Sequence, residues 1–292
     1  GDLVKARASA EGSTKLIRTG KDLKSYSGFL TIDESTDSNL FFWFFPAQEN
    51  PDKAPVILWV NDIPGFSSVV GIFLETGPFE LEENNVVTDR NVTWTKTHSM
   101  LYIDAPVGTG FSFANNENAF ANNSDEEAIG IYEALKQFFI LFNEFQPRDF
   151  YLAGETYAAT LIPYVQKKQF DDAMSQGLVE FNKGNIQKAS ELFWTTVIGP
   201  GSLLENTTGF LDWRSALMDK PLLDESKFLK FIDSKEIHNY LHVGLHKFMN
   251  GDPNVYTRFT KEFAGAHEDL IQEMLDRGYR VLFYSAQFDL AT

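Results

Sequence analysis

Residues Phe150 to Ala159 read FYLAGETYAA, and they indicate the architecture of the chain more clearly than any other segment. The first four residues are apolar or aromatic, which is typical of a short strand, whereas residues 160–168 carry a helix-like pattern. Gly154 and the alanines near the end of the stretch permit a sharp turn between them. A strand that turns sharply into a helix presents the residue at its tip, here Thr156, at the end of a sheet. We therefore expect the chemistry of this chain to centre on residue 156.

Further apolar runs predict the rest of a central sheet. The predicted strands cover residues 27–32, 39–45, 55–60, 99–104, 150–153 and 280–284. The last four are short apolar runs, which is typical of strands buried on both faces of a sheet that helices cover. A helix is predicted over residues 125–145, with Ser124 as its N-cap, because apolar residues recur at helical spacing from Ile129 to Phe142. Strands that alternate with helices indicate the α/β class.

The chain divides into a core and an insertion. Residues 1–25 carry little pattern and are expected to form an extended leading segment. From residue 171 to about residue 250 the pattern is helical throughout. We therefore predict the first part of an α/β core over residues 1–170, a helical cap insertion over residues 171–254, and the last part of the core over residues 255–292.

The composition argues against several classes of function. Acidic residues outnumber basic ones by 41 to 25, which gives a formal net charge of −16 and argues against nucleic acid or an anionic membrane as a partner. No apolar run approaches the roughly 18 residues of a membrane span. The chain has no cysteine, so disulfides, thiolate catalysis and cysteine-based metal sites are excluded.

Three N-glycosylation sequons point to the secretory route. They begin at Asn91, Asn122 and Asn206. The first residues of the sequence, GDLV, show no leader peptide, which fits a processed chain as well as a cytosolic one. The sequons favour a secreted protein, or one in an endomembrane lumen such as that of a lysosome.

Five motifs occur in an order that one protein family shares. They are NDIPGFSS at residues 61–68, LETGPF at 74–79, YIDAPVGTGFS at 102–112, GETYA at 154–158 and VLFYSAQFD at 281–289. They resemble the N-G-G-P-G-C-S-S, E-x-G-P-F, Y-I-D-x-P-V-G-T-G-F-S and G-E-S-Y-A motifs and the triad-aspartate strand of the serine carboxypeptidases. The aromatic run at residues 40–46 and the segment 237–244 most resemble the vitellogenic carboxypeptidase-like branch. The resemblance implies the α/β-hydrolase fold, in which helices flank a mostly parallel central sheet, with a helical cap insertion.

The resemblance assigns two residues of a catalytic triad. Thr156 stands where the family has its nucleophilic serine, and Asp289 matches the triad aspartate. The extra methyl group of threonine stiffens its χ1 angle and crowds a turn built for serine. In α/β-hydrolases the triad histidine follows the aspartate along the chain, and no histidine follows Asp289 in this sequence. We therefore expect a degenerate triad that lacks its histidine.

The resemblance also assigns an oxyanion hole and a pocket for the C-terminal carboxylate of a peptide. The oxyanion donors would be the backbone N–H groups of Ile63 and Tyr157. Asp62 and Ile63 replace the two glycines of the family motif, and their side chains add atoms where the substrate must approach the backbone. The carboxylate pocket would comprise Asn61, Glu75 and Glu155. One of its acids must be protonated for a ligand carboxylate to bind, which implies an acidic optimum.

The resemblance skips one strand of the core. After the helix that ends near Phe170, the family has a core strand that leads to a G-N-G-type turn, whereas this sequence passes directly to the insertion at Asp171. A sheet that lacks an interior strand leaves backbone groups unpaired. We therefore favour an incomplete chain over a naturally shortened protein.

Three histidines raise a weaker alternative, a zinc site. His238, His242 and His246 recur every four residues and could line one face of a helix. No glutamate stands in an H-E-x-x-H position, and Gly244 is expected to interrupt the helix. We favour a structural face for these histidines, and we expect neither a metal nor another cofactor.

The sequence leaves three functions open. The favoured one is a secreted carboxypeptidase-like pseudoenzyme with a binding or structural role, whose ligand would be a peptide C-terminus. The second is an active serine-type carboxypeptidase, a peptidase that removes C-terminal residues from peptides with Thr156 and a histidine outside this sequence. The third is a structural or assembly protein, with a second copy of the chain or a different chain as its partner.

Overall fold

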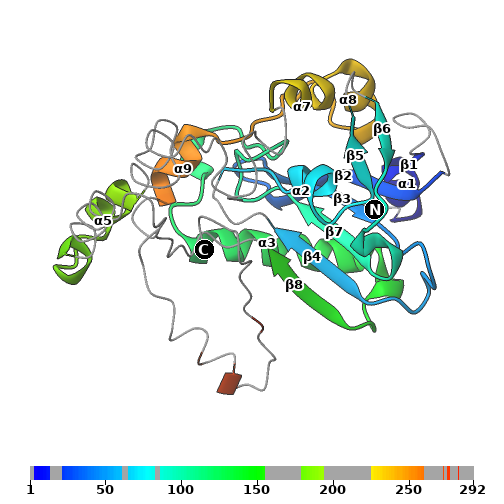
Figure 1. Ribbon diagram of the computed structural model, residues 1–292, viewed down its shortest axis with the longest axis horizontal. Helices are drawn as coiled ribbons and strands as arrows, with labels where there is room; N and C mark the ends of the chain where they lie inside the picture. Colours follow the sequence, from blue (N-terminus) through cyan, green and yellow to red (C-terminus); the bar gives the residue numbers. More distant parts are fainter. Residues whose placement is uncertain are drawn as a thin grey trace, which may run out of the picture. The chain divides into compact units, whose positions relative to one another are not determined.

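The computed structural model describes residues 3–13, 22–60, 65–82, 86–154, 179–193 and 225–259 and the single positions 272, 275, 276 and 282. The chain forms two compact units, of which the first comprises residues 1–155 and 223–258 and the second comprises residues 156–222 and 259–292. The central sheet belongs to the first unit (Figure 1). The boundaries between core and cap that the sequence suggests, at residues 170 and 254, remain predictions.

The described residues of the first unit form a mixed sheet. Its strands are β1 (Glu11–Ser13), β2 (Lys24–Asp33), β3 (Ser38–Phe45), β4 (Val56–Val60), β7 (Ser99–Ile103) and β8 (Phe150–Gly154). They lie in the order β1-β2-β3-β7-β4-β8. Neighbours from β1 to β7 pair in antiparallel fashion, whereas β4 pairs in parallel with both β7 and β8. A separate antiparallel pair consists of β5 (Phe79–Leu81) and β6 (Val87–Asp89).

Helices connect and cover these strands. The first unit contains α1 (Leu3–Ala10), α2 (Val69–Leu74), α3 (Ser124–Leu141), α7 (Glu225–Ile232) and α8 (Lys235–Leu241), with the 3-10 helices η3 (Trp94–Lys96), η4 (Glu117–Ala119) and η5 (Asn143–Phe145). The remaining described helices are α5 (Ile186–Phe193) and α9 (Pro253–Phe259). The helical pattern predicted after residue 171 is confirmed in α5, α7 and α8, whereas residues 242–252 form no helix. Within the described ranges, no helix has the length and apolar character needed to cross a bilayer.

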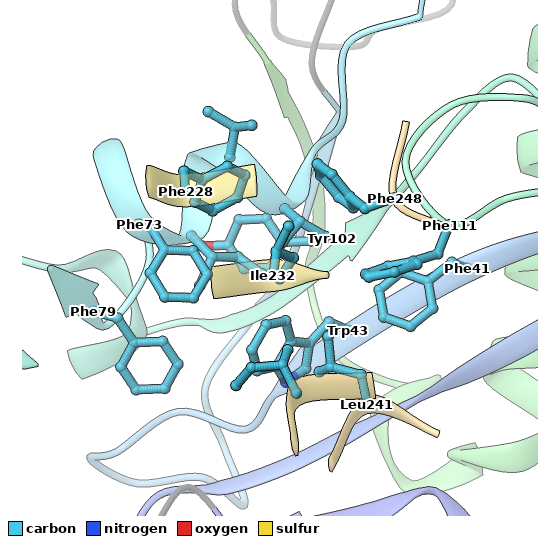
Figure 2. Packing of buried hydrophobic residues seen from close by; sticks show 14 of the residues in the cluster. Phe41, Trp43, Phe73, Phe79, Tyr102, Phe111, Phe228, Ile232, Leu241 and Phe248 are labelled. Atoms are coloured by element: carbon cyan, nitrogen blue, oxygen red, sulfur yellow. The ribbon is translucent and has the colours of Figure 1, made fainter. Parts of the chain in front are cut away.

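Strand β3 shows how the sheet is covered on both faces. All 8 of its residues are buried because alternate side chains enter two different cores. The odd-numbered residues from Phe41 to Phe45 pack with α2, α7 and α8, on what we call the α2 face. Figure 2 shows this packing, with Trp43 near Leu241 of α8 and with Phe228 of α7 in the same cluster. The even-numbered residues from Leu40 to Phe44 pack with α1 and α3 on the opposite face, the α3 face.

Most predicted strands are confirmed. Residues 27–32 and 39–45 lie within β2 and β3, and the runs 55–60 and 99–104 match β4 and β7 to within one residue at each end. Their apolar side chains are buried, as the continuous runs predict. Of the predicted strand 280–284, only residue 282 is among the described residues.

Strand β8 is found where it was predicted, but its predicted burial on both faces is wrong. Phe150 is 37% exposed, Tyr151 43% and Leu152 68%. β8 is the last strand of the sheet in the part of the chain that the structure describes. Its apolar side chains are therefore exposed to solvent, although the sequence run is typical of a central strand.

The predicted extended segment at residues 1–25 is also wrong, because α1 and β1 form there. The guanidinium of Arg7 lies over the rings of Tyr26 and Phe142, at 5.4 and 5.0 Å from their centroids. It also forms an ion pair with Glu144. A cation that lies over aromatic rings holds α1 against the α3 face. Such a contact does not require a periodic pattern of apolar residues, so the sequence gives no sign of the helix.

The helix predicted before β8 is confirmed as α3, with a different cap and a different buried side. The Asn123 side chain accepts the Glu126 N–H at 2.8 Å, so Asn123 and not Ser124 is the N-cap. Phe138 is fully buried on the α3 face, whereas Ile129 is 68% exposed. The predicted apolar stripe is therefore only partly buried, because this helix carries apolar residues on more than one side.

Candidate functional site

The carboxyl ends of the parallel strands are the place where the connections of the sheet separate. β4 is followed by α2 on one face, and β7 leads to α3 on the opposite face. Two neighbouring parallel strands whose connections leave toward opposite faces open a crevice at their carboxyl ends, where α/β proteins bind ligands. The residues that follow β4 and β7 are therefore the first candidates for a functional site.

Ser67 and Asp104 meet at this point of the sheet. The Ser67 hydroxyl donates to Asp104 Oδ1 at 2.5 Å, and the Phe111 N–H donates to Asp104 Oδ2 at 3.0 Å. Asp104 is only 1% exposed. Burial raises the pKa of its carboxyl group to about 6, although the hydrogen bonds from Ser67 and Phe111 act in the opposite direction. The pair joins the loop after β4 to the end of β7 through a carboxyl group that titrates near pH 6.

The turn after β7 folds back onto the same aspartate. The Ser112 hydroxyl donates to the Asp104 carbonyl oxygen at 2.7 Å and accepts the Phe41 N–H at 2.8 Å. A Cβ on Gly110, where φ is +56°, would lie 1.9 Å from Asp104 Oδ2, so this position requires glycine. The motif at residues 102–112 thus wraps a turn around one buried carboxyl group.

Strands β4 and β8 bring two predicted site segments to the same edge of the sheet. Val60 pairs with Gly154 in the parallel ladder, and a Cβ on residue 154 would lie 2.3 Å from the Val60 carbonyl oxygen. Glycine therefore lets the two strands meet closely at the point where each continues into a predicted site segment. Those segments, residues 61–64 and 155–178, lie outside the described residues.

Glu75 is the one acid of the predicted carboxylate pocket that the structure describes. It directly follows α2 and is half-buried. A Cβ on Gly71 would lie 3.1 Å from Glu75 Oε2 and 2.7 Å from Trp59 Nε1, so the glycine lets the carboxylate and the indole pack closely against α2. Burial raises the pKa of the Tyr102 hydroxyl, and the nearby charge of Glu75 raises it further. Glu75 is thus a carboxylate held beside aromatic side chains at the edge of the core.

The other residues that the resemblance assigns lie outside the described part of the chain. They are Asn61, Ile63, Glu155, Thr156, Tyr157, Asn206 and Asp289. Their roles in catalysis, oxyanion stabilisation, carboxylate binding and glycosylation remain predictions. Among the residues that are described, no group of three or more histidine, aspartate or glutamate side chains is placed to hold a metal ion.

Two of the three sequons begin at described residues, and both asparagines are exposed. Asn91 follows β6, and Asn122 lies just before α3. The Asn122 amide donates to Glu126 Oε2 at 3.1 Å, and its carbonyl oxygen accepts from Arg258 Nη1 at 2.7 Å. A glycan on Asn122 would have to accommodate two side-chain contacts.

The three histidines do not share one helical face, so the arrangement considered for zinc is not formed. α8 ends before His242, which adopts a φ of 60°. His238 Nε2 lies 2.9 Å from Asp233 Oδ1, and its Nδ1 lies 3.1 Å from the carbonyl oxygen of Gly244. His246 stacks on an aromatic ring whose centroid is 3.7 Å away, and burial lowers its pKa. These contacts make the histidines part of the packing around α8.

Motif similarity alone assigns no role to Ser67 or Asp104, although both stand inside recognised motifs. A local signal exists for Asp104, because it directly follows an apolar strand and a buried carboxyl group must find hydrogen-bond partners. Ser67 lies 37 residues earlier, and only the fold shows that it is the partner. The Asn250 side chain also accepts the Ser67 N–H at 3.0 Å, and this contact has no counterpart in any sequence pattern.

Comparison with known proteins agrees with this architecture. The family model described as serine carboxypeptidase matches residues 16–186, which is more than half of the chain. This chain belongs to the serine carboxypeptidase family.

Individual serine carboxypeptidases are similar to this chain over most of its length. The probable serine carboxypeptidase CPVL of Homo sapiens is 32% identical, with 93% of this chain and 68% of the relative covered. The venom serine carboxypeptidase of Apis mellifera is 33% identical, with 92% and 68% covered. The vitellogenic carboxypeptidase of Aedes aegypti is 27% identical, with 99% and 72% covered. The family resemblance inferred from the motifs is thereby confirmed.

The serine carboxypeptidase fold is confirmed by a solved structure. KEX1(DELTA)P, a prohormone-processing carboxypeptidase from Saccharomyces cerevisiae, superposes with a TM-score of 0.72 at 17% identity, and 93% of this chain and 76% of that chain are covered. The mixed sheet with helices on both faces is accordingly that of an α/β-hydrolase.

The alignments also reveal a difference in length within the matched range. They span 325, 321 and 342 positions for the three relatives, whereas the whole chain has 292 residues. Each of these serine carboxypeptidases therefore carries internal residues that have no counterpart here. A chain that lacks one core strand, as expected from the motif spacing, would produce such a difference.

Proposed function

We propose that this family member is a secreted protein with a carboxypeptidase fold that binds the C-terminal carboxylate of peptides and hydrolyses them slowly or not at all. One contrast within the sequence carries the proposal. The positions that would bind a carboxylate keep the residue types of the family, whereas the nucleophile and oxyanion positions do not.

Three substitutions support weak catalysis. Thr156 replaces the nucleophilic serine, and its methyl group restricts rotation of the hydroxyl within a sharp turn. Asp62 and Ile63 replace two glycines in the oxyanion loop. The negative charge of Asp62 would oppose charge that develops on a substrate oxygen, and loss of a single oxyanion donor lowers a rate by roughly 10²–10³.

The described part of the pocket supports retained binding. Glu75 is half-buried and packs, with the Trp59 indole, closely against Gly71 of α2. A ligand carboxylate can approach such a group only if the pair shares a proton, so we expect binding to strengthen as the pH falls.

The exposed sequons support a secretory setting. Asn91 and Asn122 both lie on the surface, which is a requirement for glycosylation. Expression in a secreting eukaryotic cell, followed by removal of N-glycans, should show a mass shift that becomes smaller in Asn91→Gln and in Asn122→Gln. Modification at neither site would argue against this part of the proposal.

The deciding experiment compares binding with turnover. An N-blocked dipeptide with a free carboxylate, and its C-terminal amide as control, are titrated at about pH 5 and pH 7 by calorimetry, while product is followed by chromatography. We expect binding of the acid at pH 5, weaker binding at pH 7, little affinity for the amide and no product. Rapid hydrolysis that Thr156→Ala abolishes and a serine-directed phosphonate blocks would overturn the proposal of an inactive protein.

The names of the relatives favour a second candidate, an active carboxypeptidase. The same assay tests it, since an active chain would release the terminal amino acid at about pH 5. A matched variant, Asp62→Gly with Ile63→Gly and Thr156→Ser, restores the residue types of the family motifs. It should raise turnover by at least roughly 10² if these positions limit the rate and a histidine outside this sequence completes the triad.

A third candidate, an assembly role, is favoured by the exposed apolar side chains of β8. Tyr151 and Leu152 are 43% and 68% exposed. Sedimentation velocity over a range of concentrations tests this role. Reversible self-association without dipeptide binding would favour it over the first candidate.

A further inference from the structure

The turn that follows α2 carries Glu75, the acid of the predicted carboxylate pocket that the structure describes. The N–H groups of residues 75–77 all donate to the Gly71 carbonyl oxygen, at 3.1, 3.0 and 3.2 Å in chain order. A Cβ on Gly77 would lie 2.2 Å from the Ile72 carbonyl oxygen, so only glycine lets the chain pass this close to the end of α2. The backbone at Glu75 is thus wound closely around the last turn of α2.

One arginine holds both ends of this turn. Arg90 directly follows β6, and its Nη2 donates to the carbonyl oxygen of Phe73, in the last turn of α2, and to that of Phe79, at the start of β5, at 3.0 Å for the second contact. The Arg90 N–H also donates to the Pro78 carbonyl oxygen at 2.8 Å. The last carbonyl groups of a helix have no partner within the helix, and a cation is favoured beside them. Arg90 therefore joins the end of α2 to the start of β5, with Glu75 between them.

The residue after Glu75 is fixed through all of its polar groups. Thr76 is 4% exposed, and its N–H donates within the turn. Its carbonyl oxygen accepts the Thr93 hydroxyl at 2.9 Å and the Trp94 N–H at 3.0 Å, and its Oγ1 lies 3.0 Å from the Tyr102 hydroxyl oxygen. The chain from Arg90 to Trp94 thus contacts the turn at its middle as well as at its ends.

The charges of Glu75 and Arg90 act on the same buried hydroxyl group. Tyr102 is 1% exposed, and burial raises the pKa of its hydroxyl. The charge of Glu75 raises this pKa further, whereas the charge of Arg90 lowers it. The Arg90 side chain is only 15% exposed, so water screens its charge poorly. The carboxylate and the guanidinium therefore belong to one electrostatic neighbourhood around Tyr102.

We propose that Arg90 is a positioning residue for Glu75. It acts through the backbone, because it fixes one carbonyl group before Glu75 and one after it, those of Phe73 and Phe79. A carboxylate that must share a proton with a ligand carboxylate binds it well only when it is held in a defined place. The effect of Arg90 on binding rests on the proposed function, in which Glu75 meets the ligand.

A second arginine of the first unit provides a matched control. Arg148 also donates to two backbone carbonyl oxygens, those of Pro51 and Ala54, which lie between β3 and β4. Arg90→Met and Arg148→Met each remove the guanidinium and keep a side chain of similar length. Both proteins are titrated with the N-blocked dipeptide acid and with its amide at about pH 5. We expect Arg90→Met to lower the preference for the acid by about tenfold and Arg148→Met to leave it unchanged. An unchanged preference in Arg90→Met, or an equal loss in both variants, overturns the proposal.

A further measurement does not depend on ligand binding. Hydrogen exchange of the Thr76 amide should be about 10- to 100-fold faster in Arg90→Met and unchanged in Arg148→Met, with the Leu101 amide of β7 as an internal control. If the unaltered protein binds neither dipeptide, the proposed function fails, while the exchange rates still decide whether Arg90 holds the turn. Equal exchange of the Thr76 amide in all three proteins overturns the positioning role.

A more conservative variant covers the case in which Arg90→Met does not fold. Arg90→Lys keeps the positive charge but lacks the planar guanidinium, so we expect it to lower the preference for the acid by about threefold. A preference equal to that of the unaltered protein in Arg90→Lys would mean that the charge alone suffices, and it would overturn the positioning role.

Discussion

Ser67 donates its hydroxyl hydrogen to the buried carboxyl group of Asp104 at 2.5 Å and so connects the loops that follow two neighbouring parallel strands. The contact lies where the connections of the sheet diverge toward its two faces, which is where α/β proteins place their ligands. The Asn250 side chain reaches the same point, where it accepts the Ser67 N–H at 3.0 Å. The scaffold of the candidate site is therefore a junction of three chain segments around one serine.

We expect Asp104 to make stability depend on pH. Its pKa of about 6 in the folded protein lies above the ordinary value of 3.8, so the folded state holds this proton more tightly than the unfolded chain does. The stabilisation is fully present below about pH 3.8 and is lost as the pH rises through about 6, and linkage converts the shift to about 3 kcal/mol. Asp104→Asn should remove this loss. Urea unfolding between about pH 4 and pH 7 measures it, and an equal loss in the variant would assign the effect to other groups.

Ser67→Ala should move the same titration upward. The Ser67 hydroxyl bond lowers the pKa of Asp104, so its removal leaves burial less opposed and raises the pKa above about 6. Ser112→Ala is a matched control, because its hydroxyl contacts the Asp104 carbonyl oxygen and not the carboxyl group. Carbon-13 NMR titration of the Asp104 carboxyl group reads both. A lower pKa in Ser67→Ala would contradict the role assigned to this bond.

Gly154→Ala should destabilise the junction of β4 and β8. A Cβ at this position would lie 2.3 Å from the Val60 carbonyl oxygen, a backbone atom that cannot move away without distorting the ladder. We expect a loss of at least about 1–3 kcal/mol in the free energy of unfolding. Gly28→Ala serves as the control, since its Cβ would meet only the Phe42 side chain, at 3.7 Å. Similar stability of the two variants would mean that the strands separate more easily than their register indicates.

The two sides of α3 should respond differently to truncation. Phe138 is fully buried against the sheet, so Phe138→Ala should lower the free energy of unfolding by about 3–5 kcal/mol. Ile129 is 68% exposed, and Ile129→Ala should change it by no more than about 0.5 kcal/mol. Thermal or denaturant unfolding distinguishes them. A large effect at Ile129 would point to a covering partner in solution.

The sheet could be predicted from sequence where burial leaves a strong local signal. β3, β4 and β7 are buried on both faces, and their runs of apolar residues mark them clearly. The same kind of run in β8 predicts burial wrongly, because the exposure of a strand depends on its neighbours in the fold and not on its composition. The sequence does not predict α1, because the guanidinium of Arg7 holds this helix in place by lying over two aromatic rings. The cap of α3 shifts by one residue, because Asn123 and Ser124 are both competent caps.

The candidate site is less predictable for a similar reason. Motif similarity identifies Glu75 and the segments at residues 61–68 and 102–112, but it gives no pairing between them. Ser67 and Asp104 are 37 residues apart, and Ser67 and Asn250 are 183 apart. Such contacts follow from the strand order and from the direction of each connection. A local sequence pattern indicates neither the strand order nor the direction of a connection.

Strand β8 has a consequence for how the protein must be handled. Its five residues, FYLAG, include no charge and no proline, and the apolar side chains face solvent at the last strand of the described sheet. Natural sheets usually protect an exposed strand with lysine, proline or a bulge, because an unprotected strand can pair with strands of other molecules. Dilution, low temperature and a solubilising additive should therefore slow the aggregation of the purified protein. Substitution of a lysine for Leu152 should do the same while leaving the folded core intact.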